Sequence, residues 1–456
     1  MTCAAVIGGS VAGLLAARVL ADHFDHVVIL DRDTPPDGPR DRKCVPQGPH
    51  VHGLLPAGGD ALRELFPGLL EELVSAGGIV FDMGSEIRWF IGGVWRVQKS
   101  FGIPGYSQSR AFLEFYIRQR VQKLANVECR FGCDVSELLV EPGAKRVQGL
   151  RVCTRNTAED LRADLVVDCS GRGSRLASWL QEAGFGKPLA RTVTINIGYS
   201  SRIYRPPLGW KRDWVLLMIT ATPPDRFKSA AIFVVEVGNW MVTLNGCCRN
   251  YPPHDEEGFL NFAREVEQPD VYEAIRSAEP LTPIAVHRFP ASVRLDYARL
   301  KTFPAGLLPL GESIASFNPV YGQGMTVAAL EAVALRKLLR NHGVAGSHPP
   351  QLCRDYFPEA KRIIDRAWAM AAGGDLNYRG AEGQRPLGSK LTRLYAKQVL
   401  GLCAYDPEVA RVWMCVAGML KGPGSLFQPR IVGRVLRYAF SGPSRSLHDG
   451  DTSRAN

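Results

Sequence analysis

The sequence predicts an α/β protein in which a Rossmann-like domain, a parallel sheet with helices, is combined with an antiparallel-sheet domain and with C-terminal helices. Three observations support this prediction. A strand, a helix and a second strand follow one another over residues 4–30, as in a βαβ unit. Runs rich in β-branched and aromatic residues replace this alternation between about 190 and 290, and beyond Pro349 the readable pattern is helical.

The parallel part begins with a short apolar strand over residues 4–7, a helix over 12–21 and a β-rich run over 27–30. The intervening helix favours parallel pairing of the two strands. From Ser109 a further helix carries one apolar stripe, which is made of Leu113, Tyr116, Ile117, Val121 and Leu124. These elements predict helices packed against a buried sheet.

The middle of the chain predicts a separate antiparallel sheet. Its expected strands cover residues 192–197, 214–220, 231–237 and 240–244, with Gly238-Asn239 as the turn between the last two. Buried strands over 165–167 and 306–310 and a helix over 325–339 belong to the first pattern. The later helices are expected to break near Gly373 and Pro386.

Composition excludes several classes of protein. The 456 residues are 46% hydrophobic and 22% charged, which is typical of a folded globular chain. The net charge of +10 is spread without a Lys/Arg-rich block, so we expect no nucleic-acid partner. Eleven cysteines without a CxxC pair predict reduced thiols. A secretory signal peptide has a cation before its apolar segment, whereas the first cation here, Arg18, follows the apolar strand, so we expect no signal peptide. We expect a cytoplasmic protein without a membrane-spanning helix.

The first chemical motif is Gly8-Gly9-Ser10-Val11-Ala12-Gly13, between a strand and a helix, with Asp31 closing the next strand. Glycines at such a turn let the backbone approach a pyrophosphate, whose charge lies at the helix N-terminus. An acid about 20 residues further on binds the ribose hydroxyls. The motif predicts a dinucleotide site, although Ser10 replaces the middle glycine, and it leaves NAD and FAD as alternatives.

The second motif is Leu310-Gly311-Glu312-Ser313, followed by Phe317-Asn318-Pro319-Val320-Tyr321-Gly322-Gln323-Gly324-Met325 and a helix. An acid at a strand end can accept hydrogen bonds from ribityl hydroxyls. The glycines allow the amides of the next helix to point at a flavin ring and to stabilise charge that develops on it. Together the two motifs favour FAD over NAD.

With these motifs the chain resembles the group A flavoprotein monooxygenases and, within that superfamily, the flavin epoxidases of polyether antibiotic biosynthesis. The resemblance runs from residue 1 to about 440. It is carried by the two motifs and by Asp31-Arg32-Asp33, Arg42-Lys43-Cys44-Val45-Pro46-Gln47, Asp168-Cys169-Ser170-Gly171-Arg172-Gly173-Ser174 and Glu279-Pro280-Leu281-Thr282-Pro283. The run Gly324-Met325-Thr326-Val327-Ala328 is also similar to squalene epoxidase.

The resemblance implies the following domains. Residues 1–190 form the first part of the FAD-binding domain, with a short substrate-domain insertion near 80–105. Residues 191–290 form the antiparallel-sheet substrate domain, and residues 291–345 form the second part of the FAD-binding domain. Residues 346–456 form the C-terminal helical region.

The resemblance also implies FAD-binding positions. The cofactor-binding residues are expected to be Gly8, Ser10, Val11, Ala12, Gly13, Asp31, Arg32, Arg42, Arg110, Val135, Glu312, Pro319, Gly322, Gly324 and Met325. Val11 and Ala12 would lie at the pyrophosphate, and Asp31 and Arg32 at the adenosine ribose. Arg42 would lie near the isoalloxazine or ribityl end, and Arg110 on the pyrophosphate or ribityl side unless it merely begins its helix. Val135 would pack on adenine, and the backbone of Met325 would approach the flavin.

Two positions depart from the pattern of the superfamily. The usual Gly-Asp is Gly311-Glu312, so the ribityl contact must shift or pass through water. The usual Asp-Gly is Ser170-Gly171, as in the epoxidase and halogenase branches.

The implied activity is that of an FAD-dependent monooxygenase. It would insert one O2-derived oxygen into a lipophilic natural-product intermediate, by epoxidation of an alkene or by hydroxylation, through a flavin C4a-hydroperoxide. NAD(P)H would supply electrons directly or through a flavin reductase. We assign no catalytic residue and no metal, and we interpret His50 and His52 as loop or cavity-wall residues. Tyr321 and Phe317 are either core residues or a lid at the flavin.

Three other functions stay open. An FAD-dependent isoprenoid reductase would keep the same cofactor motifs. A flavin halogenase would share Ser170-Gly171, but the Trp-x-Trp-x-Ile-Pro signature is absent. A non-catalytic flavin- or lipid-binding protein would account for Ser10 and Glu312.

The C-terminal region predicts two amphipathic helices. Asp406-Pro407 begins the first, and Pro429 begins the second, in which Arg430, Arg434 and Arg437 share one face. Such a basic helix either caps the fold or rests on an anionic membrane from which a lipophilic substrate is collected. The expected location is therefore cytoplasmic, with peripheral membrane contact as the alternative.

Overall fold

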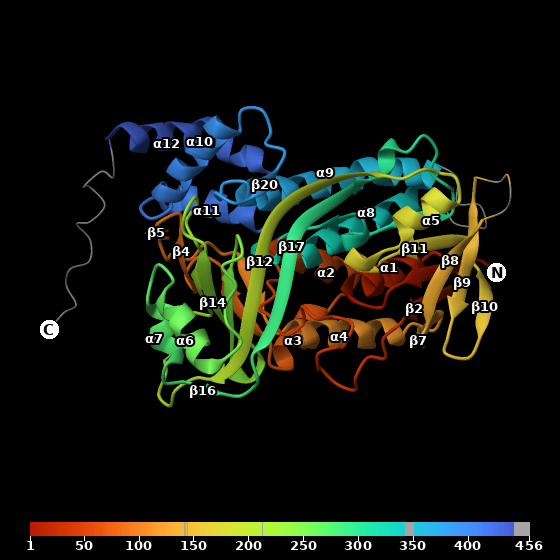
Figure 1. Cartoon of the computed structure of the whole chain (residues 1–456), viewed down its shortest axis with the longest axis horizontal. Helices are drawn as coiled ribbons and strands as arrows, with labels where there is room; N and C mark the ends of the chain where they lie inside the picture. The colour runs from red at the N-terminus through yellow and green to blue at the C-terminus, as the bar shows by residue number, and fades with distance from the viewer. Residues whose placement is uncertain (141–142, 144, 212, 343–350, 442–456) are drawn as a thin grey trace.

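A computed structural model describes residues 1–140, 143, 145–211, 213–342 and 351–441. At one end of the molecule lies a five-stranded sheet of order β18-β11-β1-β2-β7, and at the other lies a larger, mostly antiparallel sheet (Figure 1). The strands of the first sheet are β1 (Cys3–Ile7), β2 (His26–Asp31), β7 (Val127–Phe131), β11 (Leu165–Asp168) and β18 (Leu307–Pro309). The predicted α/β class is confirmed.

The first sheet is parallel throughout its path. Each of its three inner strands is a run of apolar residues, as expected for a sheet covered on both faces. Helix α1 (Val11–Ala21) connects β1 to β2 and buries Leu14 and Leu15 completely. Helix α4 (Arg110–Gln122) begins where Ser109 accepts a hydrogen bond from the Phe112 amide, the N-cap contact that its sequence favours.

The second sheet is built around two long strands, β12 (Leu189–Arg205) and β17 (Ala285–Asp296), which run between the two ends of the molecule (Figure 1). Its remaining strands are β4 (Ile87–Ile91), β5 (Val94–Trp95), β13 (Leu216–Ile219), β14 (Lys228–Val234), β15 (Trp240–Gly246), β16 (Glu279–Pro280), β19 (Ala315–Ser316) and β20 (Glu382–Gly383). β4 pairs with β13 in parallel, so residues from the first hundred enter this sheet.

One predicted strand ends early. The run over 231–237 was expected to be extended to its end, but β14 stops at Val234 and residues 236–238 form a 3-10 turn. Val237 there has a φ of 60°, which a strand does not accommodate.

The C-terminal half is helical. Helices α8 (Gly324–His342) and α9 (Gln351–Asp375) pack together beside the first sheet, and α9 continues through Gly373, where a break was expected. Helices α10 (Ser389–Leu402), α11 (Pro407–Ala417) and α12 (Pro429–Ser441) form a separate group beyond the second sheet (Figure 1). Within the ranges described, no helix has the length and apolar character needed to cross a bilayer.

Several elements were not predicted. They include the strands β7 and β17, the hairpin of β3 (Ile79–Asp82) and β6 (Pro104–Ser107), the sheet of β8 (Asp134–Val140), β9 (Val147–Cys153) and β10 (Ala158–Arg162), and the helices α2 (Pro56–Leu65), α3 (Leu69–Ser75), α5 (Leu176–Glu182), α6 (Glu256–Arg264) and α7 (Asp270–Ile275).

Candidate functional site: a dinucleotide turn beside an apolar cavity

The glycine-rich turn between β1 and α1 is shaped by close backbone contacts. A Cβ atom on Gly13 would lie 1.7 Å from the Gly8 carbonyl oxygen, so only glycine allows the helix to approach the strand this closely. Gly8 itself has a φ of 99°. Ser10 is the N-cap residue of α1, but its side chain caps no amide of the helix. Because Ser10 does not cap them, the first-turn amides of α1 can bind an anion.

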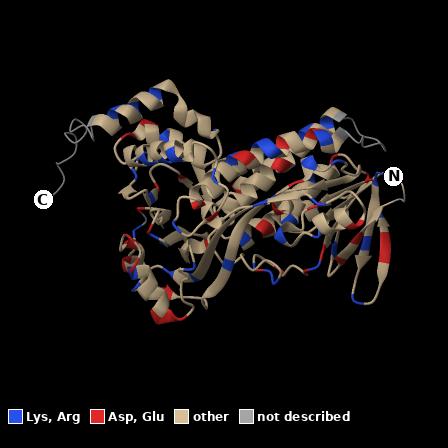
Figure 2. Ribbon diagram, turned by 45° about the horizontal axis from the view of Figure 1, so that its top comes forward, with Lys and Arg blue, Asp and Glu red and all other residues tan. Residues whose placement is uncertain are grey.

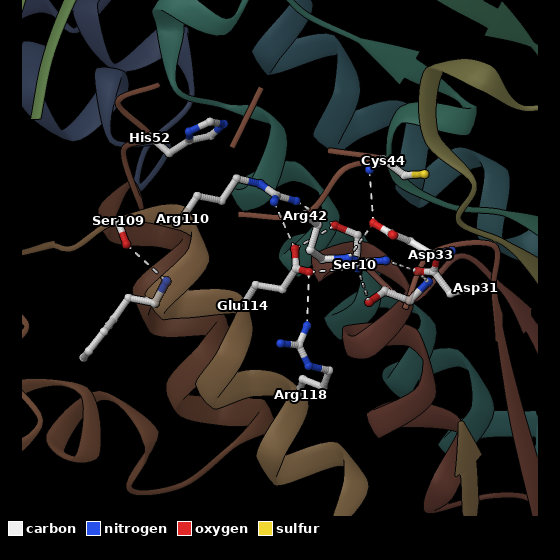
Figure 3. Close-up of polar contacts among 12 residues, drawn as sticks. Ser10, Asp31, Asp33, Arg42, Cys44, His52, Ser109, Arg110, Glu114 and Arg118 are labelled. Carbon is white, nitrogen blue, oxygen red and sulfur yellow. Dashed lines mark hydrogen bonds and ion pairs between the residues drawn. The ribbon is translucent and has the colours of Figure 1, made fainter. Parts of the chain in front are cut away.

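Next to this turn lies a buried cluster of charges (Figure 3). Asp31, at the end of β2, accepts hydrogen bonds from the Gly9 amide and from Arg42 Nη2, both at 2.7 Å. Arg42 Nε lies 3.3 Å from Asp33 Oδ2, and Arg42 Nη1 donates to Glu114 Oε1 at 2.9 Å. Asp31 is therefore held at the strand end where the dinucleotide motif requires an acid.

Glu114, on α4, joins this cluster to the N-terminus of α1. Ser10 Oγ donates to Glu114 Oε2 at 3.0 Å and accepts from Arg110 Nη2 at 2.6 Å (Figure 3). Arg118 also pairs with Glu114, at 3.4 Å. Burial would raise the pKa of Glu114, but the charges of Arg110 and Arg42 and the hydrogen bonds from Arg42 and Ser10 outweigh it and lower the pKa. Glu114 is consequently ionised at neutral pH.

The second motif lies against the same end of α1. A Cβ atom on Gly311 would be 3.1 Å from Ala12 Cβ, so the turn after β18 packs directly on the first turn of the helix. Glu312 Oε1 lies 3.5 Å from the Cβ position of Gly324, where α8 begins and is followed by Met325. Burial raises the pKa of Glu312, while Arg172 and Arg110 oppose the shift. The two motifs, 300 residues apart, thus form one site.

A cavity of about 1010 Å³ lies between the turn from Asn318 to Gly322 and the second sheet. Pro319 and Gly322, between β19 and α8, line one end of it together with Gly53. A Cβ atom on Gly53 would meet nothing within 4 Å, so the wall is open there. Much of the remaining wall is apolar, and the strands β4, β13 and β14 and the helices α9, α10 and α11 contribute to it. A cavity of this size and lining suits a lipophilic molecule.

A hydrogen-bonded polar group interrupts the apolar wall beside Pro319. Tyr199, on β12, donates to Asn318 Oδ1 at 2.8 Å, and Asn318 Nδ2 donates to Asp375 Oδ1 at 2.9 Å. Tyr321 donates to the same Asp375 oxygen at 3.2 Å, while Asp375 Oδ2 is buried without a partner among the described residues. Burial raises the pKa of Asp375 to about 7 despite these donors.

His50 and His52 also lie on the cavity wall. Burial lowers the pKa of His50 to about 4 and, together with Arg110, that of His52 to about 3, so both rings are neutral at pH 7. His50 Nδ1 lies 2.7 Å from Ser201 Oγ. Within the described part of the chain no His, Cys, Asp and Glu side chains form a metal-binding group.

We compared the sequence and the fold of the chain with those of known proteins. No protein-family model matches the chain. Its sequence is 32% identical over 459 residues to Protein Rv3254 of Mycobacterium tuberculosis (strain ATCC 25618 / H37Rv), covering 95% of this chain and 93% of that protein. The chain belongs to the family of Rv3254.

Solved structures share the fold of this Rv3254-family chain. The p-nitrophenol 4-monooxygenase PnpA from Pseudomonas putida DLL-E4 matches with a TM-score of 0.63 and 16% identity, over 93% of this chain and 100% of that one. The flavin-dependent brominase Bmp2 matches with a TM-score of 0.62 and 13% identity, over 96% and 99%. The chain therefore shares its fold with flavin-dependent enzymes of this kind, which confirms the predicted fold.

The residues present fit FAD. Uncapped amides at the start of α1 suit a pyrophosphate, and Asp31 at the end of β2 suits ribose hydroxyls. At the start of α8, Gln323 Oε1 and Thr326 Oγ1 are buried without a partner among the described residues. Glu312 lies between these two helix ends.

The remaining predicted residues differ in how far they are exposed to solvent. Arg32 is exposed one residue beyond Asp31, and Val135 is buried in β8, which begins where the Cys133 amide donates to the Asp31 carbonyl. Arg42, expected near the ribityl or ring end, lies with Asp31. Its role toward FAD stays a prediction, as do those of the other site residues.

Several side chains of the site were missed or ranked low from the sequence. Glu114 and Asp375 were not singled out, because their partners Arg42 and Asn318 are 72 and 57 residues away. Tyr321 lines the cavity, whereas Phe317 is a core residue. Trp89 and Tyr106 also line the cavity.

Proposed function

We propose that this chain is an FAD-dependent monooxygenase that adds one oxygen atom from O2 to a lipophilic small molecule, by epoxidation or hydroxylation. The observation that carries the proposal is the continuity between the Pro319–Gly322 turn at the start of α8 and the apolar cavity. A neighbour of the same fold is a p-nitrophenol 4-monooxygenase. NAD(P)H is the proposed electron donor, either directly or through a flavin reductase.

Bound FAD, once reduced, would activate O2 in this pocket. The first-turn amides of α1 and the Arg110 guanidinium would hold the pyrophosphate, and Asp31 and Glu312 would hold the sugar and ribityl hydroxyls. Apolar residues from the second sheet exclude water and align the substrate, which protects a reactive oxygen species from wasteful release. The Tyr321–Asp375 pair can donate or accept a proton at this end of the cavity.

Enlarging Gly53 tests where the ring and substrate lie. Gly53→Leu places a side chain in open space at the end of the cavity next to Gly322, and its backbone does not need a left-handed conformation. We expect the free energy of unfolding to remain within about 0.5 kcal/mol, because the Cβ atom meets no protein atom within 4 Å and the side chain can extend into the cavity. The rate of substrate-stimulated NAD(P)H oxidation should fall at least about tenfold, since displacing the substrate by 1 Å from its reactive position can lower the rate by about 100-fold. Gly53→Ala is the matched control and should keep most activity.

A set of spectroscopic and oxygen measurements separates the alternatives. A monooxygenase should purify with a flavin spectrum and consume O2 in proportion to oxygenated product. An isoprenoid reductase would reduce its substrate without O2, and a brominase-like enzyme would depend on halide. A colourless protein, or one whose flavin is not reduced by NAD(P)H with or without a reductase, would contradict the proposed function and favour a binding role.

A further inference from the structure

The helices at the far end of the cavity carry most of the net positive charge of the protein. Residues 384–441 contain nine Lys and Arg against two Asp and Glu, while the whole chain has a net charge of +10. Figure 2 shows Lys and Arg along the helices of this group. The two acids, Asp406 and Glu408, are paired with Arg430 and Arg434 between α11 and α12. The exposed side of α10 therefore has cations and no acid.

The same helices expose large apolar side chains. On α10, Leu391 and Leu394 are 74% and 58% exposed, and Leu387 just before it is completely exposed. On α12, Phe440 is 87% exposed and Leu436 48%. These residues recur at spacings of three and four, so each helix presents one apolar outer stripe.

This exposure is not a failure of core packing. The inner face of α12 buries Ile431 and Val435 against α10 and α11. The three helices therefore share a hydrophobic core to which the exposed side chains do not belong. Lys390 and Lys397 lie on the same outer face of α10 as its leucines, because three, four and seven residues separate them along the helix. Lysines beside exposed leucines can keep their ammonium groups at the lipid headgroups while the leucines enter the acyl boundary of a bilayer.

The outer face is continuous with the cavity. Leu387, Lys390, Arg393 and Phe427 line the cavity that reaches Pro319 and Gly322 at its other end. Leu387 and Phe427 are also exposed, so this part of the lining is a mouth. A lipophilic molecule that leaves a bilayer here would enter the cavity without crossing water.

We propose that α10, α12 and the Pro423–Phe427 turn form a docking surface for an anionic lipid bilayer, from which lipophilic molecules enter the cavity. Charge complementarity selects anionic lipid, since each Lys or Arg near such a surface strengthens binding several-fold. The exposed leucines and Phe440 select a lipid surface over an acidic protein, because they can insert between acyl chains without a matching pocket. The docking is independent of flavin chemistry.

Sedimentation of the full-length protein with vesicles tests this surface. We expect binding to vesicles of phosphatidylcholine and phosphatidylglycerol in equal parts, and at least about tenfold weaker binding to phosphatidylcholine alone. The double variant Leu391→Ser/Leu394→Ser and the double variant Lys390→Gln/Lys397→Gln should each weaken binding to the anionic vesicles about tenfold or more. Leu208→Ser, at a fully exposed leucine on another loop, is the matched control and should bind as the parent does.

A tryptophan at the surface supplies a direct readout. Leu391→Trp should give blue-shifted fluorescence with anionic vesicles, and bromine-labelled lipid should quench it. No sedimentation of the parent protein with anionic vesicles, parent-like binding by either double variant, or fluorescence that lipid does not alter would each overturn the docking proposal. The assay needs no bound flavin, so its failure leaves the proposed oxygenation standing, and a failure of oxygenation leaves the docking standing.

Discussion

Substituting Ser10→Asp is expected to weaken FAD binding on the order of 100-fold. Ser10 Oγ lies at the N-terminus of α1, within 3.0 Å of Glu114 Oε2 and 2.6 Å of Arg110 Nη2. The surrounding cluster is balanced, with three guanidinium groups facing three carboxylates. A fourth carboxylate would add a negative charge beside the pyrophosphate, and repulsion of roughly 2–4 kcal/mol at a few ångströms corresponds to this loss.

Ser10→Asn is the matched control for this substitution. Asparagine has the size of aspartate and is an equally good N-cap residue, but it carries no charge. Binding of FAD to apoprotein, followed by quenching of flavin fluorescence, should therefore be weakened far less by Ser10→Asn than by Ser10→Asp. Thermal unfolding of the apoproteins reports whether either variant is damaged. Equal affinities for the two variants would mean that the phosphates do not lie at this helix end.

The parts of the site that sequence analysis located are those whose chemistry is local. Gly8, Gly13 and Asp31 lie within one βαβ unit, where the spacing of strand, turn and helix fixes their geometry. The turn from Asn318 to Gly324 is equally local, and its proline and glycines are residues that predict a turn from the sequence alone. The predicted antiparallel sheet was found because its inner strands are apolar.

The missed parts depend on contacts between distant segments. Glu114 reads as one more charged position on an amphipathic helix, and its burial becomes evident only when α4 meets Arg42 and Ser10. Strand β10 has the sequence Ala-Glu-Asp-Leu-Arg and is largely exposed, so no apolar alternation marks it. The basic face of α12 was visible, but its Arg430 and Arg434 pair with α11, and the exposed leucines on α10 were recognised only from the structure.

Asp375→Asn is expected to change the pH dependence of stability more than any other single carboxylate substitution at the cavity. The side chain is 1% exposed, and its pKa is raised from 3.8 to about 7 by burial. The folded protein therefore binds one more proton than the unfolded chain between pH 4 and pH 7. This contribution to stability is complete below about pH 4 and is lost as the pH rises through 7. The difference of about three pKa units corresponds to roughly 4 kcal/mol at pH 8.

The asparagine variant avoids this loss because it has no proton to release. Its side-chain oxygen can keep the hydrogen bonds from Asn318 and Tyr321, and its amide takes the place of Asp375 Oδ2, which has no described partner. We expect Asp375→Asn to be more stable than the parent at pH 8 by up to about 4 kcal/mol and similar to it at pH 4, as measured by urea unfolding. Asp60→Asn, at an exposed carboxylate, should show no such difference. If the difference in stability between Asp375→Asn and the parent does not widen from pH 4 to pH 8, Asp375 is ionised at its ordinary pKa, and it cannot exchange a proton near neutral pH at this end of the cavity.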